Sequence, residues 1–491
     1  MMKWLEKTNF HKKPLPDQGS LQGVLSLHSR VLAWPEFLIK TSKQFQRIWN
    51  CCGNYLLIAA AIFVILASVF GDLFRFFHSP QHHYDFYNSY QAARALYFGN
   101  DPYQSGSGWY IYPPFYAFLL LPLAPYSETF AHLFWLGVNL LLILLIIIWG
   151  LRVLTSIFQL TLNCWQAAGA CALAILLSQD QIHQVFIQGQ NDFLCLAGMA
   201  LSFYWMERKP FSSGIGLGLA AAIKYQGIFF LPFLLFRARW RVALAMVMTM
   251  VTCELLPALI AGWGRNLNYL RFAFKGMANM GNGSGLANDQ AARVPNVLWS
   301  GNISITSGLG RIFQAHHWSA NSWLMVMILI TLSVFLALRW MFQRQNIPFL
   351  YRTPRTLGNV HKEKMIFYLE CCVLLLCMLI LSPQCTRRHL ALLLNVNLLA
   401  SVMLLCPFSQ IKRWPVLITI LISQLALVRP PIPSLYFYVD YIGLPCWGYL
   451  FFLFVIIGQG LVYYRRTYYG AEQSNDNFVN LVKAIDKQAI S

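Results

Sequence analysis

Long apolar runs recur between residues 53 and 463, and they constrain the fold more than any other feature of this chain. Several of them exceed the roughly 18 residues that mark a transmembrane helix. A segment inside lipid must satisfy its own backbone hydrogen bonds, which a helix does without a partner. Only 11% of the residues are charged, against roughly 25% in a soluble protein. We therefore predict an all-α polytopic membrane protein.

In chain order, the apolar runs predict about twelve transmembrane helices, within a range of roughly 10–13. The predicted spans are residues 53–71, 130–151, 165–178, 193–206, a hairpin of two short pieces at 211–223 and 227–236, 242–261, 320–342, 365–381, 389–406, 414–428 and 441–463. Residues 115–124 are too short and too rich in proline for a span. We expect them to be re-entrant or to pack against the bundle at its outer face.

The basic residues between the runs set the predicted orientation, because cytoplasmic loops carry an excess of Lys and Arg. We place Lys40, Arg208, Arg239, Lys364 and Arg465 on the cytoplasmic side. No cleavable signal peptide is recognisable, so we expect the first helix to be an uncleaved anchor. The resulting division is a basic cytoplasmic segment at 1–50, one transmembrane domain at 51–466 with external loops at 72–129 and 262–318, and a cytoplasmic tail at 467–491.

The net charge of +19 comes from basic residues that cluster between apolar runs. This is the pattern of cytoplasmic loops, and it argues against nucleic-acid binding. The twelve cysteines show neither zinc nor haem spacing, and most lie in apolar segments, where Cys acts as a small hydrophobe.

The stretch 84–115, YDFYNSYQAARALYFGNDPYQSGSGWYIYPPF, follows the first apolar run and predicts an ordered external loop with its own helix. The aromatic face predicted for this helix comprises Phe86, Tyr90, Ala93 and Tyr97. Gly99 is its expected C-cap. Asp85 begins the helix, where a carboxylate can cap the first turn and meet the positive end of the dipole. Alternatively, Asp85 is a catalytic carboxylate held at the membrane surface.

Under this topology, polar clusters from distant parts of the chain converge at the outer boundary of the membrane. These clusters are Asp85, Tyr110–Pro114, Gln188–Asp192, Lys224 and Ser382–His389. Charged groups near the hydrocarbon region are costly and tend to mark function. The alternative for Lys224, at the tip of the hairpin, is harmless snorkelling to the interface. A transporter would place its ionisable groups near the midplane, and Glu254, shortly before Pro257, is the best such feature.

A carboxylate, several cations and aromatic surfaces beside lipid suit the transfer of a sugar from a lipid-phosphate donor. The acceptor hydroxyl needs a general base, which Asp85 can supply. The phosphate leaving group needs cations, and Lys224, Arg387 and Arg388 are suitable. Aromatic side chains such as Trp109 suit sugar and polyprenyl packing. The sequence shows no nucleotide-binding glycine loop, which is consistent with a lipid-linked donor.

Three patches of the chain resemble glycosyltransferase family 87. The first is YDFYNSYQAARALYFGNDPY with the following YIYPPFYAFLLLPL, the second is GQNDFLCLAGMAL with GIGLGLAAAIKYQGIFFLPFLL, and the third is LSPQCTRRHLALLL. They span residues 85 to 394 in the order of the family. The resemblance implies a GT-C fold, a polyprenyl-phosphate-linked sugar as donor, and Asp85 as the catalytic base. The third patch departs from the family, in which a His or aromatic pair often follows the Ser-Pro segment.

We therefore predict a membrane glycosyltransferase of the bacterial cytoplasmic membrane, with its active site on the external, periplasmic side. It would move a sugar from polyprenyl phosphate to a glycolipid or glycan acceptor, with inversion and without a metal or other cofactor. Within the matching patches we assign substrate binding to Tyr112, Gln190, Asn191 and His389. The rival hypotheses are a transporter or flippase of a lipid-linked sugar and a non-catalytic membrane scaffold.

Overall fold

The computed structural model describes residues 53–78, 85–106, 110–280, 297–350, 360–406, 408, 410–428 and 438–490 of the chain. Residues Leu57–Ser491 group into one compact unit, and the elements discussed below belong to it. The predicted cytoplasmic segment at 1–50 and the side chain of Trp109 lie outside the described residues.

The described residues form helices joined by short connections, and they include no strand, which confirms the predicted all-α class. The longer helices are Gly53–His78, α2 (Asp85–Tyr97), α4 (Glu128–Phe158), α5 (Cys164–Leu177), α6 (Gln179–Gln188), α7 (Asp192–Trp205), α8 (Pro210–Ile223), α10 (Trp240–Leu255), α12 (Trp263–Met280), α13 (Ile305–Ala315), α14 (Ala320–Arg344), α15 (Val360–Ile380), α16 (Leu394–Leu405), α17 (Arg413–Leu427) and α19 (Leu444–Ile490). The shorter ones are η1 (Pro102–Gln104), α3 (Pro114–Leu119), η2 (Leu121–Leu123), η3 (Tyr225–Phe229), α9 (Phe230–Phe236), α11 (Ala258–Ala261) and η6 (Arg387–Leu393).

In the described part of the chain, six helical segments are long and apolar enough to cross a membrane, and two of them combine consecutive helices, α10 with α11 and η6 with α16. They are Gly53–His78, Glu128–Phe158, Trp240–Ala261, Ala320–Arg344, Arg387–Leu405 and Leu444–Tyr468. The pair α5 and α6, bent by 66°, makes up to seven if it forms one broken span. The chain is therefore a multi-pass membrane protein. The other predicted spans fall on helices that do not meet this test, so the count of about twelve stays a prediction.

Close helix packing positions α8 in the middle of the bundle, between α7 and α10. The sequence GIGLGLAAA places small residues on both sides of α8, which lets backbones approach closely. A Cβ atom on Gly216 would lie 2.6 Å from the carbonyl oxygen of Gly198 on α7. On the opposite side, a Cβ atom on Gly218 would lie 2.6 Å from the carbonyl oxygen of Met246 on α10. This packing fixes the C-terminal end of α8, where Lys224 follows.

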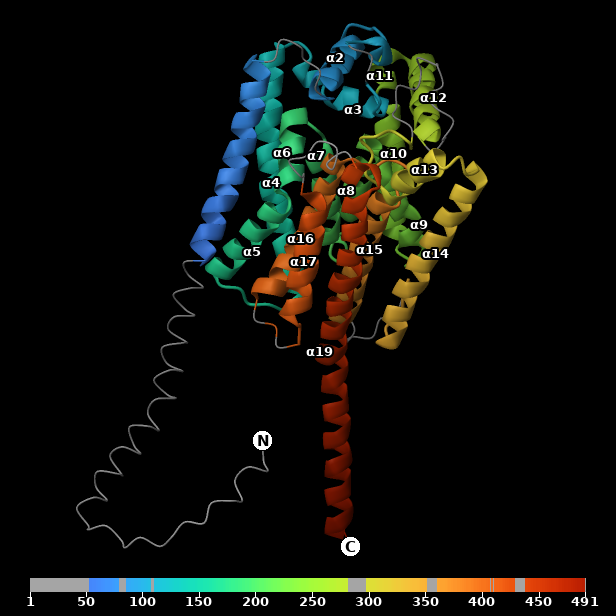
Figure 1. The fold of residues 1–491 in the computed structure, drawn as a ribbon. Helices are drawn as coiled ribbons and strands as arrows, with labels where there is room; N and C mark the ends of the chain where they lie inside the picture. The colour runs from blue at the N-terminus through green and yellow to red at the C-terminus, as the bar shows by residue number, and fades with distance from the viewer. Residues whose placement is uncertain are drawn as a thin grey trace, which may run out of the picture. The chain divides into compact units, whose positions relative to one another are not determined.

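The helix predicted after the first span is α2, and Gly99 follows its end with a φ of 78°. Helices α2 and α3 lie together at one end of the bundle, uppermost in Figure 1. The buried face of α2 includes Phe86 and Tyr90 as predicted, but Tyr97 is 50% exposed. Leu96 takes the inward position instead, at 1% exposure, because the last turn of the helix directs residue 97 away from the bundle.

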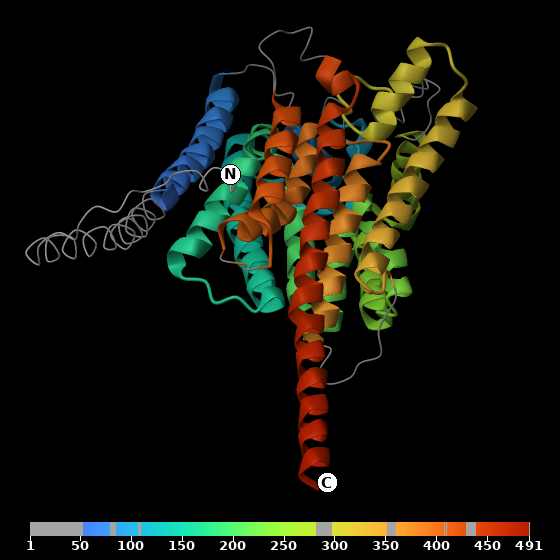
Figure 2. The same ribbon diagram turned by 60° about the horizontal axis from the view of Figure 1, so that its bottom comes forward.

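Residues 115–124, which we predicted to be re-entrant or to pack against the bundle, form a buried corner against its helices. Helix α3 and η2 occupy it, and Phe115, Tyr116 and Ala117 are buried there. Helix α19 runs beside α15 and α17, and its last turns continue away from the end of the bundle at which α2 lies (Figures 1 and 2). Helix α2 and the basic turns between the helices therefore lie at opposite ends of the transmembrane spans.

Candidate active site

Asp85 is the first residue of α2, and two side chains from distant parts of the chain contact its carboxylate. Its Oδ2 atom lies 2.7 Å from Nη1 of Arg388, at the start of η6. The side-chain amide of Gln190 donates a hydrogen bond to the same oxygen. The Asp85 side chain is 30% exposed and that of Arg388 is 23% exposed, so a ligand can reach the pair.

Gly189 is the residue that brings the connection between α6 and α7 against α2. It has a φ of 59°, in the left-handed region that favours glycine. A Cβ atom at this position would lie 2.5 Å from the Cβ atom of Phe86, the neighbour of Asp85. The indole nitrogen of Trp135 on α4 donates to the Gly189 carbonyl oxygen at 2.9 Å. This close approach places Gln190, one residue further, on the Asp85 carboxylate.

The buried ring of Tyr112 extends the hydrogen-bond chain, because its hydroxyl donates to Oε1 of Gln190 at 2.9 Å. Burial, and secondarily the charge of Asp85, raises the pKa of Tyr112 well above its usual value. Tyr112 therefore stays a neutral donor that orients the Gln190 amide. Two other tyrosines hold the backbone of this segment. Tyr103 donates a hydrogen bond to the Tyr112 carbonyl oxygen at 2.9 Å, and Tyr110 donates one to the Pro113 carbonyl oxygen at 2.6 Å.

Lys224 forms a second ion pair close to the first. Its Nζ atom lies 2.6 Å from Oδ1 of Asp192 and 6.0 Å from the centroid of the Tyr112 ring. Asp192 begins α7, and its side chain is fully buried. Within the described residues, its second oxygen has no hydrogen-bond partner, and neither do the amide atoms of the neighbouring Asn191. These unpartnered polar atoms are what a polar ligand at this site would use.

The side chains of the two adjacent arginines of η6, Arg387 and Arg388, point in different directions. Arg387 is buried, with Nη2 2.7 Å from Oδ1 of Asp440, Nη1 3.5 Å from a carboxylate oxygen of Asp180, and a hydrogen bond of 2.6 Å to the Leu427 carbonyl oxygen. Residues of a 3₁₀-helix lie about 120° apart around its axis, so Arg388 faces Asp85 while Arg387 faces the other way. These contacts favour a positioning role for Arg387, different from the phosphate-binding role that we predicted.

His389 is the third residue of η6 and is buried. Its Nδ1 atom accepts a hydrogen bond of 3.2 Å from the backbone N–H of Thr386, which fixes the orientation of the ring. The structure therefore brings Asp85, Arg388, Gln190 and Tyr112 into one connected cluster, with Lys224 against the Tyr112 ring. Their roles toward a substrate stay predictions.

The sequence analysis missed the partners of the basic residues. Asp192 and Lys224 were both expected at the outer boundary of the membrane, but their ion pair was not predicted. A signal was present, since Asp192 begins one helix and Lys224 ends the next, which places both at the same end of an antiparallel pair. Asp440 and its role as the partner of Arg387 had no such signal, because 53 residues separate the two.

These features define a class of protein: a multi-pass membrane protein with a partly exposed carboxylate and two cations gathered at one end of its bundle. The sequence model of glycosyltransferase family 87 matches residues 110–353, about half of the chain. The chain belongs to glycosyltransferase family 87, and the family indicates a glycosyltransferase. The matched range contains Tyr112, Gln190 and Lys224, whereas Asp85 and Arg388 lie outside it. A comparison with curated proteins found no match.

Proposed function

We propose that this glycosyltransferase moves a sugar from a polyprenyl-phosphate donor to a hydroxyl of a glycolipid or glycan acceptor. The observation that carries the proposal is the pairing of Asp85 with Arg388 beside the pairing of Asp192 with Lys224. A lipid-phosphate donor becomes more anionic at its phosphate as the sugar leaves, so cations placed there stabilise the transition state. The proposed arrangement of the helices is the GT-C fold that the family resemblance implies.

Both cations keep donors available for a phosphate without releasing their carboxylates. A guanidinium has five N–H donors and an ammonium has three. Arg388 uses Nη1 toward Asp85, and its Nε atom has no partner in the described part of the chain. Lys224 uses one N–H toward Asp192. We assign the donor phosphate to Arg388 and Lys224, and substrate hydroxyls to Gln190 and Asn191.

The proposed reaction is a single displacement. The acceptor oxygen attacks the anomeric carbon, Asp85 takes the hydroxyl proton, and the bond between the anomeric carbon and the phosphate oxygen breaks. The electron pair of that bond leaves with the polyprenyl phosphate, held by Arg388 and Lys224. One displacement inverts the anomeric centre. Because Asp85 is the exposed member of its hydrogen-bond chain with Gln190 and Tyr112, it is the group that an acceptor can reach.

The proposed site lies on the external side of a bacterial cytoplasmic membrane. Support comes from the separation of charges along the bundle: α2 lies at one end, and the turn with Arg208 and Lys209 follows the opposite end of α7 (Figure 1). Basic turns favour the cytoplasm. Polyprenyl-linked donors would then reach Asp85 from the outer leaflet.

Transport of a lipid-linked sugar is the second candidate, and Glu254 is the observation that favours it. This residue is 7% exposed on α10, and neither of its carboxylate oxygens has a hydrogen-bond partner in the described part of the chain. Ionisable groups inside spans often belong to transport pathways. Transport would need no base, so it should survive the change Asp85→Asn.

The test is label transfer by the purified protein from two classes of radiolabelled donor, polyprenyl-phosphate sugars and nucleotide sugars, into a total lipid extract. We expect product only from the polyprenyl-phosphate donors, and none from the Asp85→Asn variant. Product from nucleotide sugars alone would contradict the donor class. Full transfer by Asp85→Asn would contradict the assigned base.

A further inference from the structure

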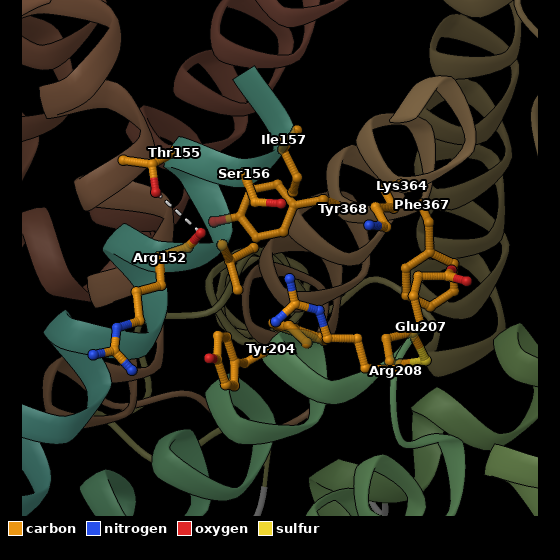
Figure 3. Close-up of a pocket in the computed structure, with 13 residues that line it drawn as sticks. Arg152, Thr155, Ser156, Ile157, Tyr204, Glu207, Arg208, Lys364, Phe367 and Tyr368 are labelled. Atoms are coloured by element: carbon orange, nitrogen blue, oxygen red, sulfur yellow. Dashed lines mark hydrogen bonds between the residues drawn. The ribbon is translucent and has the colours of Figure 1, made fainter. Parts of the chain in front are cut away.

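A hollow of about 260 Å³ lies at the end of the bundle opposite Asp85, far from the proposed active site (Figure 3). Its walls come from the last turns of α4, the end of α7 with the turn that follows, and the first turns of α15. A second hollow, of about 570 Å³, adjoins it and shares Met206, Glu207 and Arg208. The proposed sugar transfer uses neither of them.

The charge around the first hollow is basic and not neutralised. Arg152, Arg208 and Lys364 line it, and none of the three forms an ion pair in the described part of the chain. The one acidic residue of the lining, Glu207, already pairs with Arg239 at 2.5 Å. In Figure 3, the nitrogen atoms of Arg208 and Lys364 point into the space between α4 and α15, whereas the guanidinium of Arg152 points away from it.

The remaining lining residues suit an amphiphile. Hydroxyl groups of Ser156 and Tyr204 also line the hollow, and they can donate hydrogen bonds to an anion. Apolar side chains of Ile157 and Phe203 line it as well. An excess of basic residues explains an attraction to anionic lipids in general. It does not explain two cations that point into one partly apolar hollow, which is the arrangement of a site.

The depth of the hollow in the membrane favours a lipid over a soluble phosphate. Helix α4 has 31 residues, and at about 1.5 Å per residue it is ~46 Å long. The hydrocarbon core is only ~30 Å thick, so α4 extends beyond it. Arg152 and Ser156 in its last turns are exposed, and a charged side chain there places this end of α4 in the headgroup layer. Trp240 in the adjoining hollow is 64% exposed, as expected for an aromatic residue at the membrane interface.

We propose that this hollow is a binding site for the phosphate of an anionic membrane lipid, held by Arg208 and Lys364. The lipid headgroup occupies the polar part, and the upper part of its acyl chains lies along the apolar wall. The site is separate from the proposed active site. The bound lipid links the turn after α7 to the first turns of α15, beside the last turns of α4.

The test is native mass spectrometry of the purified protein in non-ionic detergent, titrated with phosphatidylglycerol. We expect one tightly retained lipid on the wild type and at least about tenfold weaker retention on Arg208→Gln/Lys364→Gln. The matched control, Lys209→Gln/Lys412→Gln, removes two charges from exposed residues outside the hollow, and it should bind like the wild type. Equal weakening in both double variants would overturn the proposal, because it would reflect net charge alone.

A second variant and two further probes separate the remaining explanations. Ser156→Phe fills the hollow without changing its charge, so it should also lose the lipid while its thermal unfolding stays close to that of the wild type. Retention by Ser156→Phe would place the lipid elsewhere. Phosphatidylcholine should bind at least about tenfold more weakly than phosphatidylglycerol. Displacement of phosphatidylglycerol by equimolar glycerol 3-phosphate would overturn the lipid assignment in favour of a soluble phosphate.

Discussion

Replacing Gly189 by alanine tests how the candidate site is assembled. The new side chain would sit at a φ of 59°, where an L-residue costs about 1–2 kcal/mol. Its Cβ atom would also lie 2.5 Å from the Cβ atom of Phe86, and overpacking of this kind costs typically about 1–3 kcal/mol. Together these terms amount to about 2–5 kcal/mol, unless α2 and the turn after α6 move apart.

Movement would relieve the clash at the expense of the site, because Gln190 follows Gly189 directly. A displacement of ~1 Å at a positioned group can lower turnover about 10²-fold. We therefore expect Gly189→Ala to lower the thermal unfolding temperature in detergent and to lower sugar transfer per folded molecule. The matched control is Gly137→Ala on α4, which has open space around the added atom and should be neutral or stabilising by about 0.5–1 kcal/mol. Wild-type stability and turnover in Gly189→Ala would refute the reasoning.

Further predictions concern the other charged groups. Lys224→Met should lower turnover about 10²-fold, because one preorganised donor to the leaving group is lost; single-turnover kinetics measure this, and unchanged turnover would favour simple anchoring. Arg387→Gln should lower the free energy of unfolding by about 3–5 kcal/mol, since it leaves Asp440 without its partner; denaturant unfolding checks it. A cysteine at position 208 should react with an impermeant thiol reagent only from the cytoplasmic side, and labelling from outside would break the topology. Chelators should leave turnover unchanged, and a loss restored by Mg²⁺ or Mn²⁺ would contradict metal independence.

The sequence predicted local features well where one physical rule dominates. The start of α2 at Asp85 and the left-handed Gly99 after its end follow from capping and turn chemistry, and both are present. The all-α class follows from the apolar runs. The short helices α7 and α8 illustrate the limit, because their length alone does not decide whether they cross the membrane.

The partners of the charged residues could not be predicted, because they depend on how helices pack. Arg387 and Arg388 are neighbours in the sequence, yet one contacts Asp440 and the other Asp85. Only the 3₁₀ geometry of η6 separates their directions. The prediction that Lys224 lies at the tip of a hairpin held, since it follows α8 and precedes η3. Its buried pairing with Asp192 emerged only from the packing of α7 against α8.

The central claim is that Asp85 acts on the acceptor while Arg388 holds the donor phosphate. The most direct measurement compares donor binding with single-turnover transfer in purified Asp85→Asn and Arg388→Gln. We predict that Asp85→Asn binds the polyprenyl-phosphate donor at least as well as the wild type, yet loses at least about 10²-fold in transfer, because a base contributes to the reaction more than to donor affinity. Arg388→Gln should lose donor affinity. Wild-type transfer by Asp85→Asn, or unchanged donor affinity in Arg388→Gln, would contradict the account.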